Sequence, residues 1–172
     1  MASSRSLGTP VTWLDLVAIV VISAVAVVEA TRGFVPAAID LIGVVVLLNM
    51  VGGGGADVSS PAPARAGTFL VIVVVGAAVI ATASTLFDKY TKWDIGPFDR
   101  ALAVLMGVGT GIALSHAAFD AALLAYGSHY PAFAHSLLRA EVHEFRTAKA
   151  IGRALNNLGG GKTAVEEAQE RG

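Results

Sequence analysis

The fold is decided by residues 15–43, which read DLVAIVVISAVAVVEATRGFVPAAIDLIG. An apolar run follows Asp15, is interrupted by polar residues around Arg32, and then resumes. Arg32 belongs at a membrane surface, because an Arg side chain at the bilayer centre costs at least about 2.5–3.5 kcal/mol. Gly33 permits a sharp change of backbone direction, and Pro36 suits the first position of a second helix. The stretch therefore predicts a transmembrane helical hairpin.

The composition of the whole chain is typical of a polytopic membrane protein. The chain has 172 residues, of which 55% are hydrophobic and 15% charged, and its mean hydropathy is +0.68. Soluble domains carry about 25% charged residues. The net charge of −1 argues against a nucleic-acid partner, and the absence of Cys excludes disulfides, thiol catalysis and Cys-ligated metals. The first apolar run is too long for a signal peptide, so it predicts an anchor.

Four apolar segments predict an all-α transmembrane domain over residues 12–126. The expected spans are 12–31, 36–53, 66–88 and 99–126. The third contains 22 uncharged residues, from Ala66 to Phe87, and this length favours a spanning helix over the strand suggested by the β-branched run at 71–75. The Gly-, Ser-, Pro- and Ala-rich residues 52–66 predict an exposed loop, and residues 1–11 predict a loose tail.

The sequence changes character after the fourth span. Apolar residues recur at gaps of three and four over residues 131–158, which predicts an amphipathic helix resting on the membrane or on a partner. His135 and His143 lie two turns apart on that helix, too far for one metal ion, so we expect surface histidines. Residues 159–172 are rich in Gly and Glu and predict a flexible tail.

Charged residues at the ends of the spans are the first candidates for functional or structural roles. Asp15 and Glu29 bracket 13 uncharged residues. Such a segment rises only about 20 Å, so both carboxylates lie near the edges of a hydrocarbon core about 30 Å thick. They either cap helices and reach the interface, or face an internal polar path. Asp40 lies near the start of the second span, and Asp99 suits the N-cap of the fourth.

The basic residues favour one orientation of the hairpins. Arg32 and Arg100 lie in two short loops on one side of the membrane, together with Lys89 and Lys92. Short loops rich in Lys and Arg are usually cytoplasmic. The distribution therefore predicts cytoplasmic first and third loops, with both termini outside.

His116 and Asp120 are the strongest candidate pair for chemistry. They lie four residues apart on one helix face, where they can relay protons, bind a cation, or form a structural hydrogen bond. Even with His129 they supply fewer than the four protein ligands of a closed zinc site, and the His-Glu-x-x-His motif is absent. The sequence thus predicts no catalytic, cofactor or metal site.

Glycines mark the expected helix contacts. Gly107 and Gly111 form a Gly-x-x-x-Gly pair, which permits a close crossing of two transmembrane helices. Gly33 and Gly43 in the first hairpin are the other candidate packing positions.

Several of these residues form a pattern that resembles the colicin V production protein family of bacterial inner-membrane proteins. The first half contributes Trp13, Asp15, Arg32-Gly33-Phe34 and Gly43, and the second half contributes Asp99-Arg100, Leu102, Gly107 and Gly111. The resemblance covers about residues 12–125 and includes the four-helix hydropathy plan. The chain departs from the family at Ala37-Ala38, where an acidic residue is common, and at Thr110, where Arg is frequent. Asp40 can substitute for the first of these charges.

The resemblance implies a multi-pass protein of the bacterial inner membrane, associated with toxin biosynthesis through colicin V export and with envelope homeostasis. Some relatives anchor periplasmic serine proteases, but no Gly-x-Ser-x-Gly motif follows here, so we expect no enzyme activity. The leading hypothesis is a non-enzymatic assembly or scaffold component that contacts the lipid bilayer and forms a homo-oligomer or joins a membrane complex. Two alternatives are a small channel or proton-coupled transporter using His116 and Asp120, and an accessory subunit docking through residues 131–158.

Overall fold

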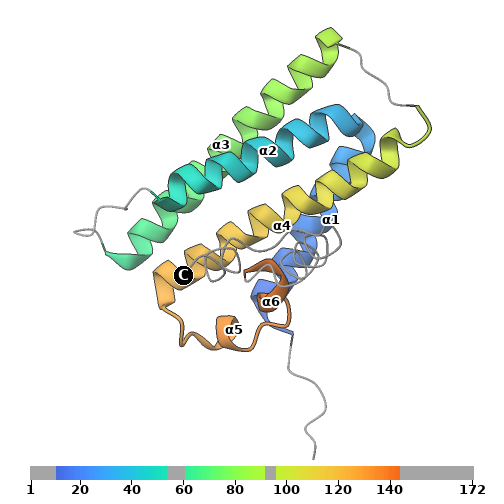
Figure 1. Cartoon of the computed structure of the whole chain (residues 1–172). Helices are drawn as coiled ribbons and strands as arrows, with labels where there is room; N and C mark the ends of the chain where they lie inside the picture. Colours follow the sequence, from blue (N-terminus) through green and yellow to red (C-terminus); the bar gives the residue numbers. More distant parts are fainter. Residues whose placement is uncertain (1–10, 54–60, 92–95, 144–172) are drawn as a thin grey trace, which may run out of the picture.

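A computed structural model describes residues 11–53, 61–91 and 96–143 of the chain. Across these residues the protein is entirely helical, with four long helices, two short ones and no strand (Figure 1). The long helices are α1 (Trp13–Arg32), α2 (Phe34–Gly53), α3 (Ala62–Thr91) and α4 (Asp99–Tyr126), and the short ones are α5 (Pro131–Ala134) and α6 (Arg139–Val142).

The four long helices confirm the predicted all-α, polytopic architecture. Each contains a segment of 19 to 29 residues that is long and apolar enough to cross a membrane. Much of their apolar surface faces outward: on α3 alone, Val71, Val74, Val75 and Val79 are exposed. The protein is therefore a multi-pass membrane protein, with this surface placed against lipid.

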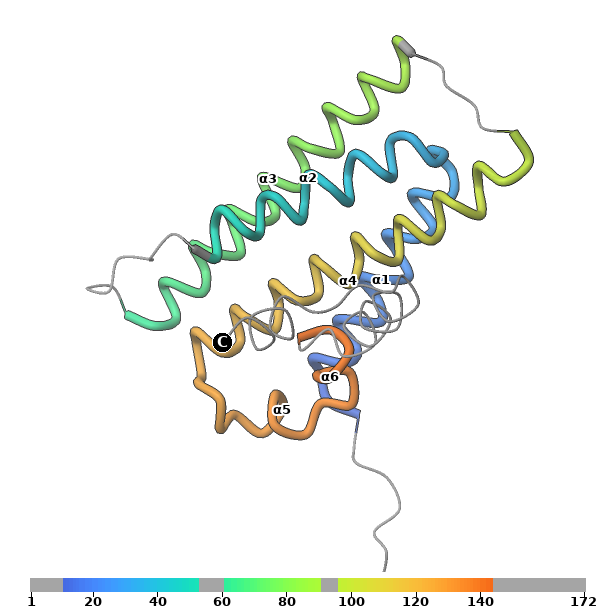
Figure 2. Tube along the Cα trace, in the orientation of Figure 1, coloured from blue at the N-terminus to red at the C-terminus, as the bar shows by residue number. Residues whose placement is uncertain are grey.

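The helices alternate in direction, and α4 lies at the centre of the bundle. It packs against α1, α2 and α3, whereas the consecutive helices α1 and α2 share few contacts. Figure 2 shows α2 and α3 side by side, with α4 between this pair and α1. The turn from α1 to α2 and the start of α4 lie at one end of the bundle, here called the Arg32 end. The start of α1, the end of α4 and both short helices lie at the other, the Asp15 end (Figure 1).

Glycines on α4 allow α1 to approach its backbone. A Cβ atom added at Gly111 would lie 2.6 Å from the Cα of Ile22, and one added at Gly107 would lie 2.9 Å from the Cα of Ala26. Both distances are shorter than any relaxed carbon–carbon contact, so side chains at these positions would push α1 away. The Gly-x-x-x-Gly pair thus lies in the α1–α4 contact.

The contact between α2 and α3 also uses small residues. A Cβ atom added at Gly43 would lie 2.6 Å from Ile80 Cγ2, and one added at Gly76 would lie 2.6 Å from Leu47 Cδ2. Each glycine on one helix therefore receives a branched side chain from the other. The blocking atoms are side-chain atoms here, so this contact has more room to adjust than the α1–α4 contact.

Asp99 occupies a different place from the one expected. The N-cap of α4 is Phe98, and Asp99 is the first helical residue. The Asp99 carboxylate instead accepts a hydrogen bond from the backbone N–H of Phe34, 3.2 Å away, at the start of α2. Gly33 has a positive φ of 97°, and a Cβ there would lie 2.6 Å from Asp99 Oδ2. The tight α1–α2 turn therefore requires glycine both for its backbone conformation and for the approach of Asp99.

The start of α3 corrects part of the loop expected over residues 52–66. The helix begins at Ala62, so it includes Pro63 and Arg65. Proline is tolerated in the first turn of a helix because those backbone N–H groups have no intrahelical partner. Pro61 and Pro63 therefore mark the beginning of α3, although the composition around them predicts a loop.

The amphipathic helix expected over residues 131–158 is not continuous in its described part. Residues 131–143 form the two short helices α5 and α6, with a bend between them. In the bend, Ser136 Oγ and the backbone N–H of Leu138 both donate to Asp15 Oδ1, at 2.6 and 3.0 Å. These bonds replace the regular helical pattern. Residues 144–158, the expected tail at 159–172 and residues 1–10 lie outside the described residues.

Candidate functional site

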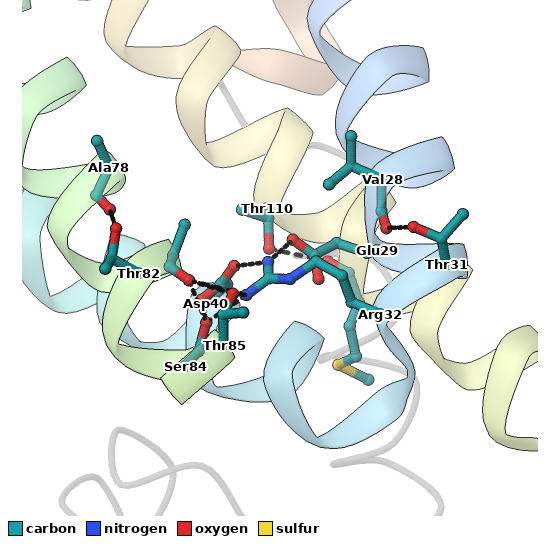
Figure 3. A network of polar contacts seen from close by, with 12 residues as sticks. Val28, Glu29, Thr31, Arg32, Asp40, Ala78, Thr82, Ser84, Thr85 and Thr110 are labelled. Atoms are coloured by element: carbon teal, nitrogen blue, oxygen red, sulfur yellow. Dashed lines mark hydrogen bonds and ion pairs between the residues drawn. The ribbon is translucent and has the colours of Figure 1, made fainter. Parts of the chain in front are cut away.

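A network of polar side chains centred on Arg32 lies inside the Arg32 end of the bundle (Figure 3). Arg32 is the last residue of α1, and its side chain turns inward rather than toward the membrane surface. Its Nη1 lies 2.8 Å from Glu29 Oε1 and 2.5 Å from Asp40 Oδ2. Both carboxylates are buried, so one guanidinium serves two acidic groups from α1 and α2.

The other side of the guanidinium binds α3. Arg32 Nη2 donates to the carbonyl oxygen of Ala81 at 3.0 Å, to Ser84 Oγ at 2.6 Å and to Thr85 Oγ1 at 2.7 Å. Ser84 in turn donates to the second carboxylate oxygen of Asp40. The forked, planar shape of the guanidinium allows this division of donors between helices. Arg32 thereby joins α1, α2 and α3.

Helix α4 closes the network on the Glu29 side. Gly107 lies against Glu29: a Cβ atom there would lie 2.9 Å from the Cβ of Glu29. Thr110 is buried one turn further along, and its Oγ1 donates to the carbonyl oxygen of Met106 at 3.0 Å (Figure 3). Glu29 Oε2 is buried, and no described residue supplies it with a hydrogen bond. Within the described structure the network holds two carboxylates and a single guanidinium.

Asp15 forms a second polar centre at the opposite end. Its Oδ2 accepts from the backbone N–H and the hydroxyl of Thr12, both at 2.8 Å, which completes a capping box at the start of α1. Its Oδ1 accepts from Ser136 and Leu138 in the bend between α5 and α6. Nearby, Trp13 Nε1 donates to the hydroxyl of Tyr130 at 3.2 Å. Of the two roles open to Asp15, the structure thus shows a cap that also binds the C-terminal segment.

The third polar centre is the predicted pair on α4, which gains a further member. His116 Nε2 lies 3.3 Å from Asp120 Oδ2, and His143 Nδ1 lies 3.3 Å from Asp120 Oδ1. His143 was expected on the surface of a continuous helix, but the bend near Ser136 brings it back to α4. We call His116, Asp120 and His143 the histidine–aspartate cluster.

The remaining candidate residues lie apart from these centres. Arg100 is exposed at the start of α4. His129 is exposed beyond the end of α4, and His135 is exposed between α5 and α6. Neither histidine joins the histidine–aspartate cluster.

The candidate residues chosen from the sequence did not include Ser84, Thr85 and Ser136, which form hydrogen bonds with the buried charged groups. A hydroxyl near the end of an apolar helix is a weak signal, because it more often bonds to its own helix backbone. Thr85 does both: it accepts from Arg32 and donates to Ala81 at 2.7 Å.

Comparisons with protein-family models, with characterised proteins and with solved structures found no match to this chain.

Proposed function

We propose that the protein is a non-enzymatic scaffold of the bacterial inner membrane, similar to the colicin V production proteins, that assembles with a second copy or with other membrane proteins. The proposal includes the roles in toxin biosynthesis and envelope homeostasis that this resemblance implies. The bundle itself is the functional unit, and its polar residues maintain its shape.

The observation that carries the proposal is that the most buried charged groups bind other parts of the same bundle. Arg32, Glu29 and Asp40 bind one another and hydroxyl groups of α3, and Asp15 binds a helix cap and the C-terminal segment. Contacts of this kind fix helices relative to one another in lipid, where apolar surface alone gives little specificity. They are the contacts expected of a rigid membrane scaffold.

The resemblance gains support from the partners of Arg32. The Arg-Gly-Phe pattern at residues 32–34 is where the chain resembles the family, and Arg32 is the centre of the largest polar network in the described residues. Asp40, the residue expected to substitute for the family's acidic position, pairs with Arg32. The Arg-Gly-Phe pattern therefore lies where side chains of α1, α2 and α3 bind one another.

The test is the state of the full-length protein in its native membrane. We expect mild detergent to release a complex larger than one chain, and crosslinking before solubilisation to give the same species. A single chain under both conditions would contradict the scaffold proposal. Other proteins that copurify with it in a fixed ratio would indicate that it is an accessory subunit of a larger membrane complex.

A small channel or proton-coupled transporter is the second candidate. The observation in its favour is that Glu29 and Asp40 share one guanidinium, and that Glu29 Oε2 has no hydrogen bond from any described residue. Such an oxygen can take a proton or a cation. His116 and Asp120, the residues first considered for this role, lie at the end of α4 against Val142 and His143 instead.

Flux measurements separate the two candidates. In proteoliposomes loaded with a pH-sensitive dye, the scaffold proposal predicts the same slow leak for the wild-type protein, for Glu29→Gln and for empty liposomes. A fast leak that Glu29→Gln abolishes, with the variant still folded, would replace the scaffold by a transporter.

A further inference from the structure

Three side chains that bind transition metals meet near the end of α4. His116 and Asp120 come from α4 itself, and His143 follows α6. One potential ligand atom from each lies within 4.8 Å of the other two. The closest approaches are both 3.3 Å, and they involve the two different oxygens of Asp120: His116 Nε2 approaches Oδ2 and His143 Nδ1 approaches Oδ1.

We propose that His116, Asp120 and His143 bind a divalent transition-metal ion of the zinc class, and that this ion attaches the C-terminal segment to α4. Zinc binds imidazole nitrogen and carboxylate oxygen at about 2.0–2.2 Å in tetrahedral geometry. Two ligands of one tetrahedral ion are then about 3.3 Å apart. Each imidazole nitrogen lies at that separation from one oxygen of Asp120, His116 from Oδ2 and His143 from Oδ1.

The hydrogen bonding of His116 supports a cation between the side chains. Its Nδ1 lies 3.1 Å from the carbonyl oxygen of Val142, and because a carbonyl can only accept, Nδ1 must carry the proton. In a neutral imidazole, Nε2 then presents a lone pair, and it faces the oxygen of Asp120. A metal ion bound between this nitrogen and this oxygen would accept electron pairs from both.

The same contact resembles the usual surroundings of a metal-bound histidine. Such a histidine donates its other N–H to a carbonyl or carboxylate, which fixes the ring orientation. Val142 provides this contact for His116, one residue before His143. The C-terminal segment therefore supplies one ligand and also orients another.

The ligand types indicate the class of ion, and the exposure of the side chains shows that an ion can reach them. Two imidazoles with one carboxylate suit zinc and its neighbours, whereas magnesium and calcium prefer oxygen ligands. The side chains of His116, Asp120 and His143 are 22%, 33% and 25% exposed, so an ion can enter from the end of the bundle. The described residues supply three of the four ligands of a tetrahedral ion.

The first experiment is calorimetric titration of ZnCl2 into the full-length protein in lipid nanodiscs, with His143→Ala, His116→Ala and the control His135→Ala. His135 is an exposed histidine of the same segment outside the cluster. We expect one tight site per chain, at least about tenfold weaker in both cluster variants and unchanged in His135→Ala. Equal zinc binding by all four proteins, or no tight site in the wild type, would overturn the proposal.

The position of His143 separates metal binding from misfolding of a variant, and one further measurement separates metal binding from protonation of the cluster. His143 lies outside the four long helices, so His143→Ala tests the site even if His116→Ala fails to fold. Zinc should slow hydrogen exchange in residues 139–143 of the wild type and of His135→Ala, and leave His143→Ala unchanged. No slowing by zinc in the wild type would show that the cluster is joined by protons alone. Equal slowing by MgCl2, or slowing that persists in His143→Ala, would show that the ion acts elsewhere, and each of these results would overturn the proposal.

Discussion

Arg32 and Asp40 face each other across the turn between α1 and α2, with Nη1 2.5 Å from Oδ2. The turn itself is one residue, Gly33, and the carboxylate of Asp99 accepts a hydrogen bond from the backbone N–H of the next residue, Phe34. This ion pair lies where three helices converge, because the other side of the guanidinium binds α3. The α1–α2 hairpin is thus closed by an ion pair of its own, to which α3 and α4 add further hydrogen bonds.

Replacing Arg32 should destabilise the bundle strongly. Arg32→Gln removes the positive charge and leaves Glu29 and Asp40 buried together, and breaking a buried ion pair costs about 3–5 kcal/mol. Thermal unfolding in detergent, followed by circular dichroism, should show a large loss of stability. Arg100→Gln is the matched control, since Arg100 is exposed, and it should unfold like the wild type. Equal stability of the two variants would show that the network does not hold the helices.

Alanine at Gly111 should weaken the α1–α4 contact. The new methyl group would lie 2.6 Å from the Cα of Ile22, and this backbone atom cannot move without displacing α1. We expect a loss of about 1–3 kcal/mol, typical of overpacking. Gly67→Ala makes the same change where nothing lies within 4 Å, so its stability should be unchanged or raised. Identical behaviour of both variants would place Gly111 outside the contact.

Ser136 should control the attachment of the C-terminal segment. Ser136→Ala removes one of the hydrogen bonds to Asp15, and a bond to a charged group contributes about 1.5–3 kcal/mol. Hydrogen exchange in residues 131–143 should therefore accelerate by about tenfold or more. Ser128→Ala, in the exposed residues after α4, should leave these rates unchanged. Slow exchange in Ser136→Ala would mean that Leu138 alone holds the segment at Asp15.

The four-helix plan could be predicted from the sequence because it depends on local quantities. The length of each apolar run and the cost of placing Arg32 in lipid together determine where the spans begin and end. The start of α3 was missed since proline both breaks a helix and begins one, and the local sequence around Pro61 and Pro63 does not distinguish these roles.

The sites were harder to predict because they depend on contacts between distant residues. The periodicity of residues 131–158 predicts a continuous helix, but Asp15, more than 100 residues earlier, binds the backbone at Leu138 and bends it. That bend brings His143 to Asp120. The partners of Arg32 on α3 depend likewise on how α3 packs against α2, and the sequence of neither helix determines this.

The central claim is that a bilayer covers the outer surface of the four helices, and cysteine labelling tests it most directly. Val45 and Val75 are 43% and 56% exposed in the isolated chain, so lipid or a protein embedded in it must cover them if α2 and α3 span the membrane. The chain has no native Cys, so Val45→Cys and Val75→Cys each carry a single thiol. Ser128→Cys, in the exposed residues after α4, is the positive control.

In opened membrane vesicles, a membrane-impermeant maleimide should label Ser128→Cys rapidly and leave Val45→Cys and Val75→Cys unlabelled until the protein is denatured. Labelling of residues 45 and 75 at the rate of residue 128 in intact bilayers would contradict the account, since it would mean that α2 and α3 do not span the membrane.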